Sequence, residues 1–131
     1  MDAGTVLRFL VTAFFAITFL QSGLDKIVDR DGNLAYLKEH FRNSPLEPMV
    51  PQMLSALTAI ELAAGVLCLL GIVTLDFRHP GLRIAGLGVA ASGLALLCLL
   101  FGQRMAKDYA GAAVVAAYFA VAALGLLAFR P

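Results

Sequence analysis

Charged residues are scarce in this sequence. Asp, Glu, Lys and Arg together make up 15% of the 131 residues, and the formal net charge is only +1. The sequence has no run of Lys or Arg, which argues against binding to nucleic acid. Hydrophobic residues reach 60%, well above the roughly one half that is usual in soluble domains. The composition therefore indicates a membrane protein.

Several chemical motifs are also missing. The sequence contains two cysteines and two histidines but no C-x-x-C pair, and no cluster of Cys, His and carboxylates has metal-binding spacing. The glycines do not form a phosphate-binding loop, because most of them lie inside apolar runs. We therefore expect no intrinsic cofactor and no metal site, and the sequence assigns no catalytic residue.

The sequence does contain four long apolar segments, at about residues 5–24, 53–73, 82–102 and 109–129. Each has ~20 residues, the length at which an α-helix crosses ~30 Å of hydrocarbon. A soluble helical bundle would need polar outer faces, which the last three segments lack. We predict an all-α, integral membrane, antiparallel four-helix bundle that forms a single domain over residues 1–131.

Four crossings would place the two termini and residues 74–81 on one side of the membrane, here called side A. Residues 25–52 and 103–108 would lie on the other side, called side B. Lys and Arg are divided too evenly between the sides for the positive-inside rule to determine the orientation. The first segment lacks the basic start and the A-x-A site of a secretory signal, so we expect it to stay as a membrane helix.

The few cysteines and histidines fall at separate places in this bundle. Cys68 lies toward side A and Cys98 toward side B, so the two thiols are expected to stay unlinked. We expect both to be buried and to pack as small hydrophobic residues. His40 belongs to the side B loop and His79 to the side A turn, so one metal or haem could not use both.

Polar residues instead converge on side B. In the stretch TFLQSGLDKIVD they recur at steps of three or four, which stacks them on one face of a helix. We predict a polar chamber at this end of the bundle. Its candidate residues are Gln21, Ser22, Asp25, Lys26, Glu61, Gln103, Arg104, Lys107 and Asp108.

Glu61 is the most informative of these residues, because it interrupts the apolar run TAIELAAGVLCLLG. An ionised carboxylate in hydrocarbon is costly, so it must be neutralised, paired, or directed away from lipid. One interpretation is a hydrogen-bonding clamp between helices, which is a common use of polar residues in membranes. The other is a functional group in a chamber that opens toward side B.

The side B loop is predicted to contain a short helix. In NLAYLKEHF, the residues Leu34, Leu37 and Phe41 have helical spacing, and Asn33 is a candidate N-cap. Such a helix would lie in the membrane interface. The three prolines of NSPLEPMVP are expected to prevent regular helix until the second crossing begins near Met53.

The order of three stretches, FLQSGLDKIVD, ELAAGVLCLLG and FGQRMAKDYAGA, resembles the DoxX family of small four-helix membrane proteins. The resemblance extends over essentially the whole chain. The positions that match the family pattern are Gly23, Lys26, Glu61, Gly65 and Gly71. It implies a protein of the cytoplasmic (inner) membrane of a bacterium, with links to thiosulfate:quinone oxidoreduction and to complexes that handle oxidative stress. The chain lacks the separate soluble domain of some thiosulfate-oxidising relatives, which argues against that particular reaction.

Two functions are consistent with these observations. The first is a non-catalytic accessory subunit of a respiratory or redox-protective membrane complex, with a contact to quinone. It would meet a larger membrane protein, or another copy of itself, through helices rich in small residues. The second is a stand-alone membrane enzyme or binding protein that holds a small lipid-soluble ligand in the chamber around Glu61. A transporter is disfavoured, because four helices offer no inverted repeat.

Overall fold

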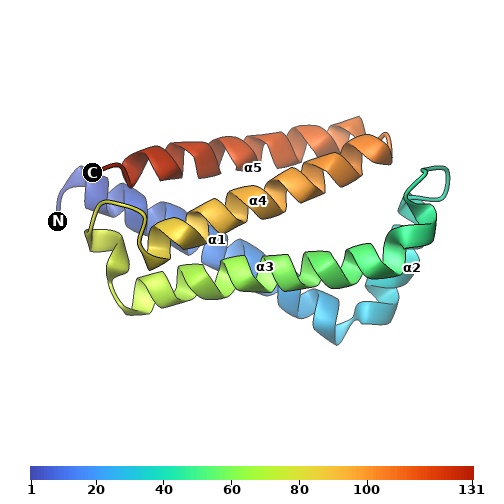
Figure 1. Ribbon diagram of the computed structural model, residues 1–131, viewed down its shortest axis with the longest axis horizontal. Coiled ribbons are helices and arrows are strands. Elements are labelled where there is room, and N and C mark those ends of the chain that lie inside the picture. Colours follow the sequence, from blue (N-terminus) through green and yellow to red (C-terminus); the bar gives the residue numbers. More distant parts are fainter.

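A computed structural model describes all 131 residues as an entirely helical protein (Figure 1). Five α-helices and two short 3-10 turns follow one another along the chain. They are α1 (Ala3–Val28), α2 (Arg30–His40), η1 (Glu47–Met49), α3 (Val50–Val73), η2 (Asp76–Arg78), α4 (Ile84–Met105) and α5 (Tyr109–Ala128). The predicted all-α bundle, with a short helix between its first two long helices, is confirmed.

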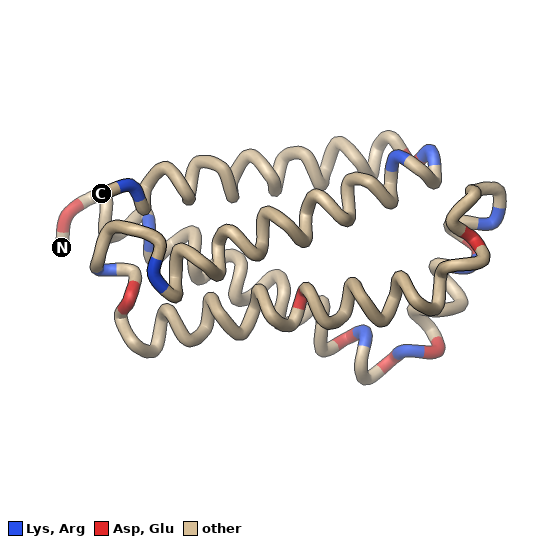
Figure 2. The backbone as a smooth tube through the Cα atoms, in the orientation of Figure 1, with Lys and Arg blue, Asp and Glu red and all other residues tan.

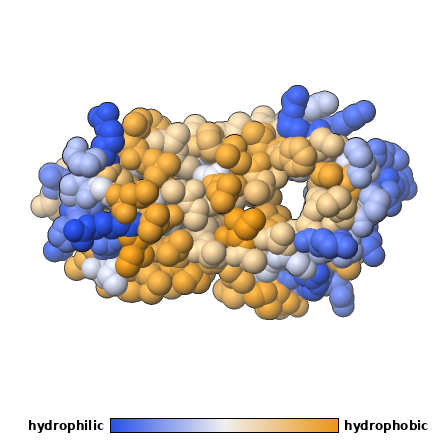
Figure 3. Space-filling model, in the orientation of Figure 1, coloured by the Kyte–Doolittle hydropathy of each residue, from blue (hydrophilic) through white to orange (hydrophobic).

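Four of these helical stretches have the length and apolar composition needed to cross a membrane: α1, α4, α5, and η1 together with α3. Hydrophobic residues form a broad band around the middle of the molecule, with hydrophilic residues at both ends (Figure 3). The charged residues gather at the same two ends (Figure 2). Glu61 is the one charged residue in α3. An apolar band with polar ends matches the profile of a bilayer, so the chain is a multi-pass membrane protein.

Two predicted helix boundaries were wrong. The short helix begins at Arg30 rather than after Asn33, because the carboxylate of Asp29 caps it by accepting from the backbone N–H of Gly32 at 3.2 Å. The third helix begins at Val50, ahead of the expected start. Pro51 is tolerated there because it lies in the first turn, where its missing N–H has no partner to lose.

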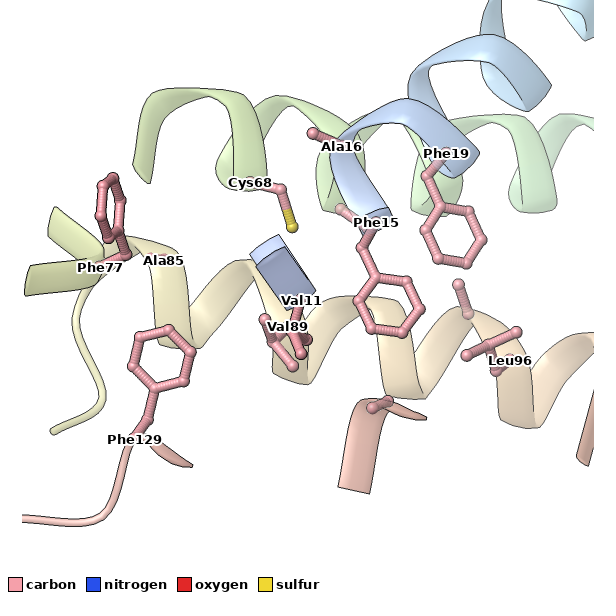
Figure 4. Packing of buried hydrophobic residues seen from close by; sticks show 13 residues of the cluster. Val11, Phe15, Ala16, Phe19, Cys68, Phe77, Ala85, Val89, Leu96 and Phe129 are labelled. Carbon is pink, nitrogen blue, oxygen red and sulfur yellow. The ribbon is translucent and has the colours of Figure 1, made fainter. Parts of the chain in front are cut away.

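The core lies where α1, α3 and α4 pack against one another. Phe15 and Phe19 of α1 stack with their ring centroids 5.9 Å apart, close to Leu96 of α4 (Figure 4). Glycines let the backbones approach: a Cβ added to Gly65 would lie 2.8 Å from the Leu20 nitrogen, and one on Gly88 would lie 2.8 Å from the Cys68 nitrogen. The small residues of α3 and α4 therefore serve packing within the chain.

Arg8 closes the side A end of the bundle through hydrogen bonds that connect three elements. Its guanidinium donates to the backbone carbonyl of Phe77 at 2.7 Å, to that of Ala128 at 3.0 Å, and to the hydroxyl of Thr5 at 3.1 Å. These bonds join α1 to η2 and to the end of α5. The sequence had indicated no polar centre on side A, because a lone arginine carries no information about distant carbonyl partners.

Candidate functional site

The side B end of the bundle contains an open cavity, whereas hydrogen bonds from Arg8 close the side A end. A mostly apolar cavity of about 630 Å³ lies there between α2, the first half of α3 and the second half of α4. Figure 3 shows an opening that passes through the molecule near this end. The volume falls within the range of roughly 300–1,000 Å³ typical of ligand pockets. The hollow is thus large enough for a small molecule.

The course of the chain explains why the cavity forms at this place. Lys26, near the end of α1, contacts Glu61 at the middle of α3, and the chain then continues alongside α3 as α2 (Figure 1). The helix α2 is short and polar and has no buried residue, so it covers α3 less closely than α1 does. Leu57 and Ile60 of α3 and Leu97 of α4 therefore face a space rather than a packed neighbour.

An ion pair occupies the inner edge of this region. The Lys26 Nζ atom lies 3.2 Å from Glu61 Oε2 and also donates to the Ser22 hydroxyl at 2.7 Å. The Glu61 side chain is 1% exposed and the Lys26 side chain 14% exposed. A buried carboxylate without a partner would be very unfavourable, so the ammonium is what allows Glu61 to lie inside the apolar band. Lys26 also lines the cavity.

A second polar cluster links α2 to the turn between α4 and α5. His40 Nε2 lies 2.6 Å from Gln103 Oε1 and 3.8 Å from Asp108 Oδ2. The Gln103 amide nitrogen donates to Asp108 Oδ2 at 3.4 Å, and Asp108 Oδ1 caps α5 by accepting from the Gly111 N–H at 2.9 Å. This cluster closes one edge of the cavity by attaching the end of α2 to α4.

The local backbone brings Gln103 and Asp108 together. Lys107 adopts the left-handed conformation, with φ at 59°, which ends α4 abruptly. The Asp108 N–H then donates to the Gln103 carbonyl at 2.9 Å. The tight turn therefore presents an amide and a carboxylate side by side to His40.

The structure divides the nine predicted chamber residues into three groups. Ser22, Lys26 and Glu61 form the ion-pair cluster, while Gln103 and Asp108 belong to the histidine cluster. The remaining four residues are exposed: Gln21, Asp25, Arg104 and Lys107. Arg104 lies over the ring of Tyr109, 4.8 Å from its centroid. The structure therefore does not bring all nine residues into one chamber. Gln21, Asp25 and Arg104 lie on outward faces of their helices, and Lys107 lies in the turn after α4.

Sequence reasoning assigned no residue of α2 to the site. Asn33, Tyr36, Leu37 and His40 all line the cavity. Their spacing of three and four residues was a usable signal, because it places them along one face of a helix. His40 had been considered only as a metal ligand. No group of three or more His, Cys, Asp or Glu side chains in the structure is arranged to hold a metal ion.

The prediction of two buried thiols was correct for only one of them. Cys68 is buried, with its sulfur 3.8 Å from the Ser92 hydroxyl. Cys98 is exposed and lines the cavity, because the side B halves of α3 and α4 do not pack together there. Both cysteines are free thiols in the structure.

These features define a small multi-pass membrane protein with a paired carboxylate inside its apolar band and a hollow at one end. The family model for DoxX matches residues 6–102, and the chain belongs to the DoxX family. The matched region contains almost all of α1 and extends into the last turn of α4, whereas α5 lies beyond it. No curated protein and no solved structure matches the chain.

Proposed function

We propose that the side B cavity binds a small lipid-soluble molecule with an apolar body and polar ring substituents. The observation that carries this proposal is the cavity itself, which has thirteen hydrophobic residues among the eighteen that line it. Pockets of this kind, with apolar walls and a few placed polar groups, are the usual form of small-molecule sites. A benzoquinone-type ring is the ligand class that the family resemblance suggests.

The polar groups at the cavity wall suit such a ring. Lys26 uses two of its three N–H groups for Ser22 and Glu61, which leaves one to donate to a ligand oxygen. Aromatic and sulfur-containing side chains, including Tyr36, Phe41 and Met53, supply flat or adaptable contacts for the ring. The cavity would position the ligand, and the Lys26–Glu61 pair would hold the helices that form its inner edge.

Two alanines on α3 allow a matched test. Ala56 lines the cavity, whereas Ala59 is exposed but does not line it. We expect wild-type protein in lipid nanodiscs to bind a short-chain benzoquinone saturably, with one molecule per chain. Ala56→Trp should weaken binding by about tenfold or more because the indole fills the hollow, while Ala59→Trp should bind normally. Non-saturable partition into the lipid, equal for all three proteins, would refute the proposal.

The accessory-subunit hypothesis is favoured by a separate feature of α5. Its exposed surface carries a stripe of alanines at steps of three and four, formed by Ala113, Ala116, Ala117, Ala120 and Ala123. Small residues facing outward permit close approach of another helix in lipid. As a second proposal, α5 docks against a larger membrane protein of a respiratory or redox-protective complex, or against another copy of this chain.

Co-purification tests the second proposal. Gentle detergent extraction from native expression, followed by mass spectrometry, should recover a partner in stoichiometric amount. Ala116→Leu combined with Ala120→Leu should lose that partner, whereas Val114→Leu, at an exposed position off the stripe, should retain it. Recovery of the chain alone as a monomer would contradict the hypothesis.

A further inference from the structure

His40 lies between two spaces of different character. It lines the apolar cavity and also a smaller, polar hollow on side B that is formed with Glu39, Arg42, Ser44 and Lys107. Its ring stacks on Tyr36 with a centroid distance of 5.4 Å. His40 therefore forms part of the wall between the apolar cavity and the polar end of the molecule.

The hydrogen bonds around His40 determine which of its nitrogens carries the proton. Asp108 is acceptor-only as a carboxylate, so the Gln103 amide must direct its nitrogen toward Asp108. The Gln103 oxygen is thereby directed at His40, and His40 Nε2 must donate to it. In the neutral ring the second nitrogen, Nδ1, then has a free lone pair. No hydrogen bond in the structure uses that atom.

Asn33 offers a second free acceptor on the same helix face. Its amide nitrogen is engaged with the Asp29 carbonyl at 2.8 Å and with the Asp25 carboxylate at 3.3 Å, both at the α1–α2 corner. Its side-chain oxygen makes no hydrogen bond. Lys26 supplies a donor, but a donor does not distinguish a carbonyl from a hydroxyl, because both oxygens accept. Selectivity must therefore come from the acceptors on α2.

We propose that His40, through Nδ1, makes the cavity selective for ligands that carry a hydroxyl group. A lipid-soluble phenol or hydroquinone would bind in preference to the matching quinone or methyl ether, neither of which can donate a hydrogen bond. This inference rests on the proposed ligand-binding function. The expected preference is about tenfold, the scale set by leaving one buried acceptor unpaired.

The test compares three ligands that differ only in their oxygens: a short-chain hydroquinone, its quinone and its dimethyl ether. Binding is measured in nanodiscs under argon, so that the hydroquinone stays reduced. Wild-type protein should bind the hydroquinone about tenfold more tightly than either of the others. In His40→Phe, which keeps a ring beside Tyr36, the preference for the hydroquinone should fall clearly below the wild-type value, because only the Asn33 oxygen remains as a free acceptor on α2. His79→Phe, at the exposed histidine on side A, should keep the wild-type preference.

The possible results separate this inference from the function on which it depends. Equal affinities in wild-type protein, a preference for the quinone, or a hydroquinone preference that is undiminished in His40→Phe would each overturn the role of His40 while leaving the cavity as a binding site. Absence of saturable binding of all three ligands to wild-type protein would refute the proposed function itself. Imidazole ¹⁵N spectra give a check that needs no cavity variant: ligand-free protein should show the Nε2–H tautomer at His40, and the Nδ1–H tautomer would overturn the assignment.

Discussion

The Lys26 ammonium and the Glu61 carboxylate, 3.2 Å apart, join the last turn of α1 to the middle of α3. The pair lies where the close packing of α1 on α3 gives way to the looser contact of α2, and Lys26 also borders the cavity. One interaction thus neutralises a charge inside the apolar band and marks the inner edge of the hollow. Its role can be divided experimentally into a structural part and a ligand-binding part.

Removing one partner of the Lys26–Glu61 ion pair should destabilise the protein more than removing both partners. Lys26→Met leaves Glu61 buried without compensation, and we expect it to lower the free energy of unfolding by about 3–5 kcal/mol. The double variant Lys26→Met with Glu61→Leu should lie within about 1 kcal/mol of wild type. Unfolding in mixed micelles measures both. Equal destabilisation by the single and double variants would show that the pair is not coupled.

Ligand binding to the stable double variant then shows whether the ion pair does more than hold α1 and α3 together. If the pair serves only as a clamp between helices, the double variant should bind the benzoquinone as wild type does. If the Lys26 ammonium holds the ligand, binding should weaken by about tenfold, the loss expected for one hydrogen bond to a charged donor. We expect the second result, since Lys26 lines the cavity.

The closed end of the bundle should depend on Arg8. Arg8→Met leaves the Phe77 and Ala128 carbonyls without their donor, and we expect a loss of about 3 kcal/mol in unfolding free energy, since bonds to charged groups contribute about 1.5–3 kcal/mol each. Arg130→Met removes an exposed arginine at the same end and should change stability by no more than about 0.5 kcal/mol. Thermal unfolding of both variants provides the comparison, and similar midpoints would contradict the clamp.

Two glycines of α4 should respond differently to the same substitution. Gly88→Ala would place a methyl group 2.8 Å from the backbone nitrogen and sulfur of Cys68, so α3 and α4 must separate. We expect a destabilisation of about 1–3 kcal/mol. A methyl group added at Gly93 would lie 3.8 Å from its nearest neighbour, so Gly93→Ala should leave the stability nearly unchanged. The resistance of each variant to unfolding by SDS tests the difference, and equal resistance would argue against close packing at Gly88.

The two thiols should differ in their reaction with a membrane-permeable maleimide. Cys98 lines the cavity and should be labelled, while Cys68 is enclosed between α3 and α4 and should be protected. Intact-mass measurement should therefore show one added label per chain, and Cys98→Ala should show none. Mild oxidation should leave both thiols unlinked. Faster labelling of Cys68, or an intramolecular disulfide, would contradict the packing described.

The long helices could be predicted from the sequence, because the length and apolar composition of a segment are enough to identify a membrane-spanning helix. The boundaries of α2 and α3 were less accurate, since both depended on local chemistry: the Asp29 cap and the tolerance of Pro51 in a first turn. The sequence placed Lys26 and Glu61 among the same candidate residues, but it left open which partner Glu61 would have. The choice among the options came from the crossing of α1 and α3, which no local pattern encodes.

The sequence predicted a chamber at side B, but the mostly apolar lining of the cavity could not be predicted, for a physical reason. An empty space arises where two apolar faces fail to meet, and the residues that line it look the same as residues of a packed core. Leu57 and Leu97 are typical of both. The exposure of Cys98 follows from the same failure of packing. Helical spacing could have grouped His40 with the other cavity residues of α2, but its bond to Gln103 depends on a three-dimensional arrangement that no local pattern encodes.

Photo-crosslinking with a diazirine-bearing phenol in nanodiscs tests the central claim most directly, because it reports where a ligand lies. The cavity account predicts saturable labelling of peptides from α2, the first half of α3 and the second half of α4, with Met53 and Cys98 among the modified positions. Ala56→Trp should abolish this labelling and Ala59→Trp should preserve it. Labelling spread over the lipid-exposed surface of α5, unchanged by either substitution, would show that the hollow binds no ligand.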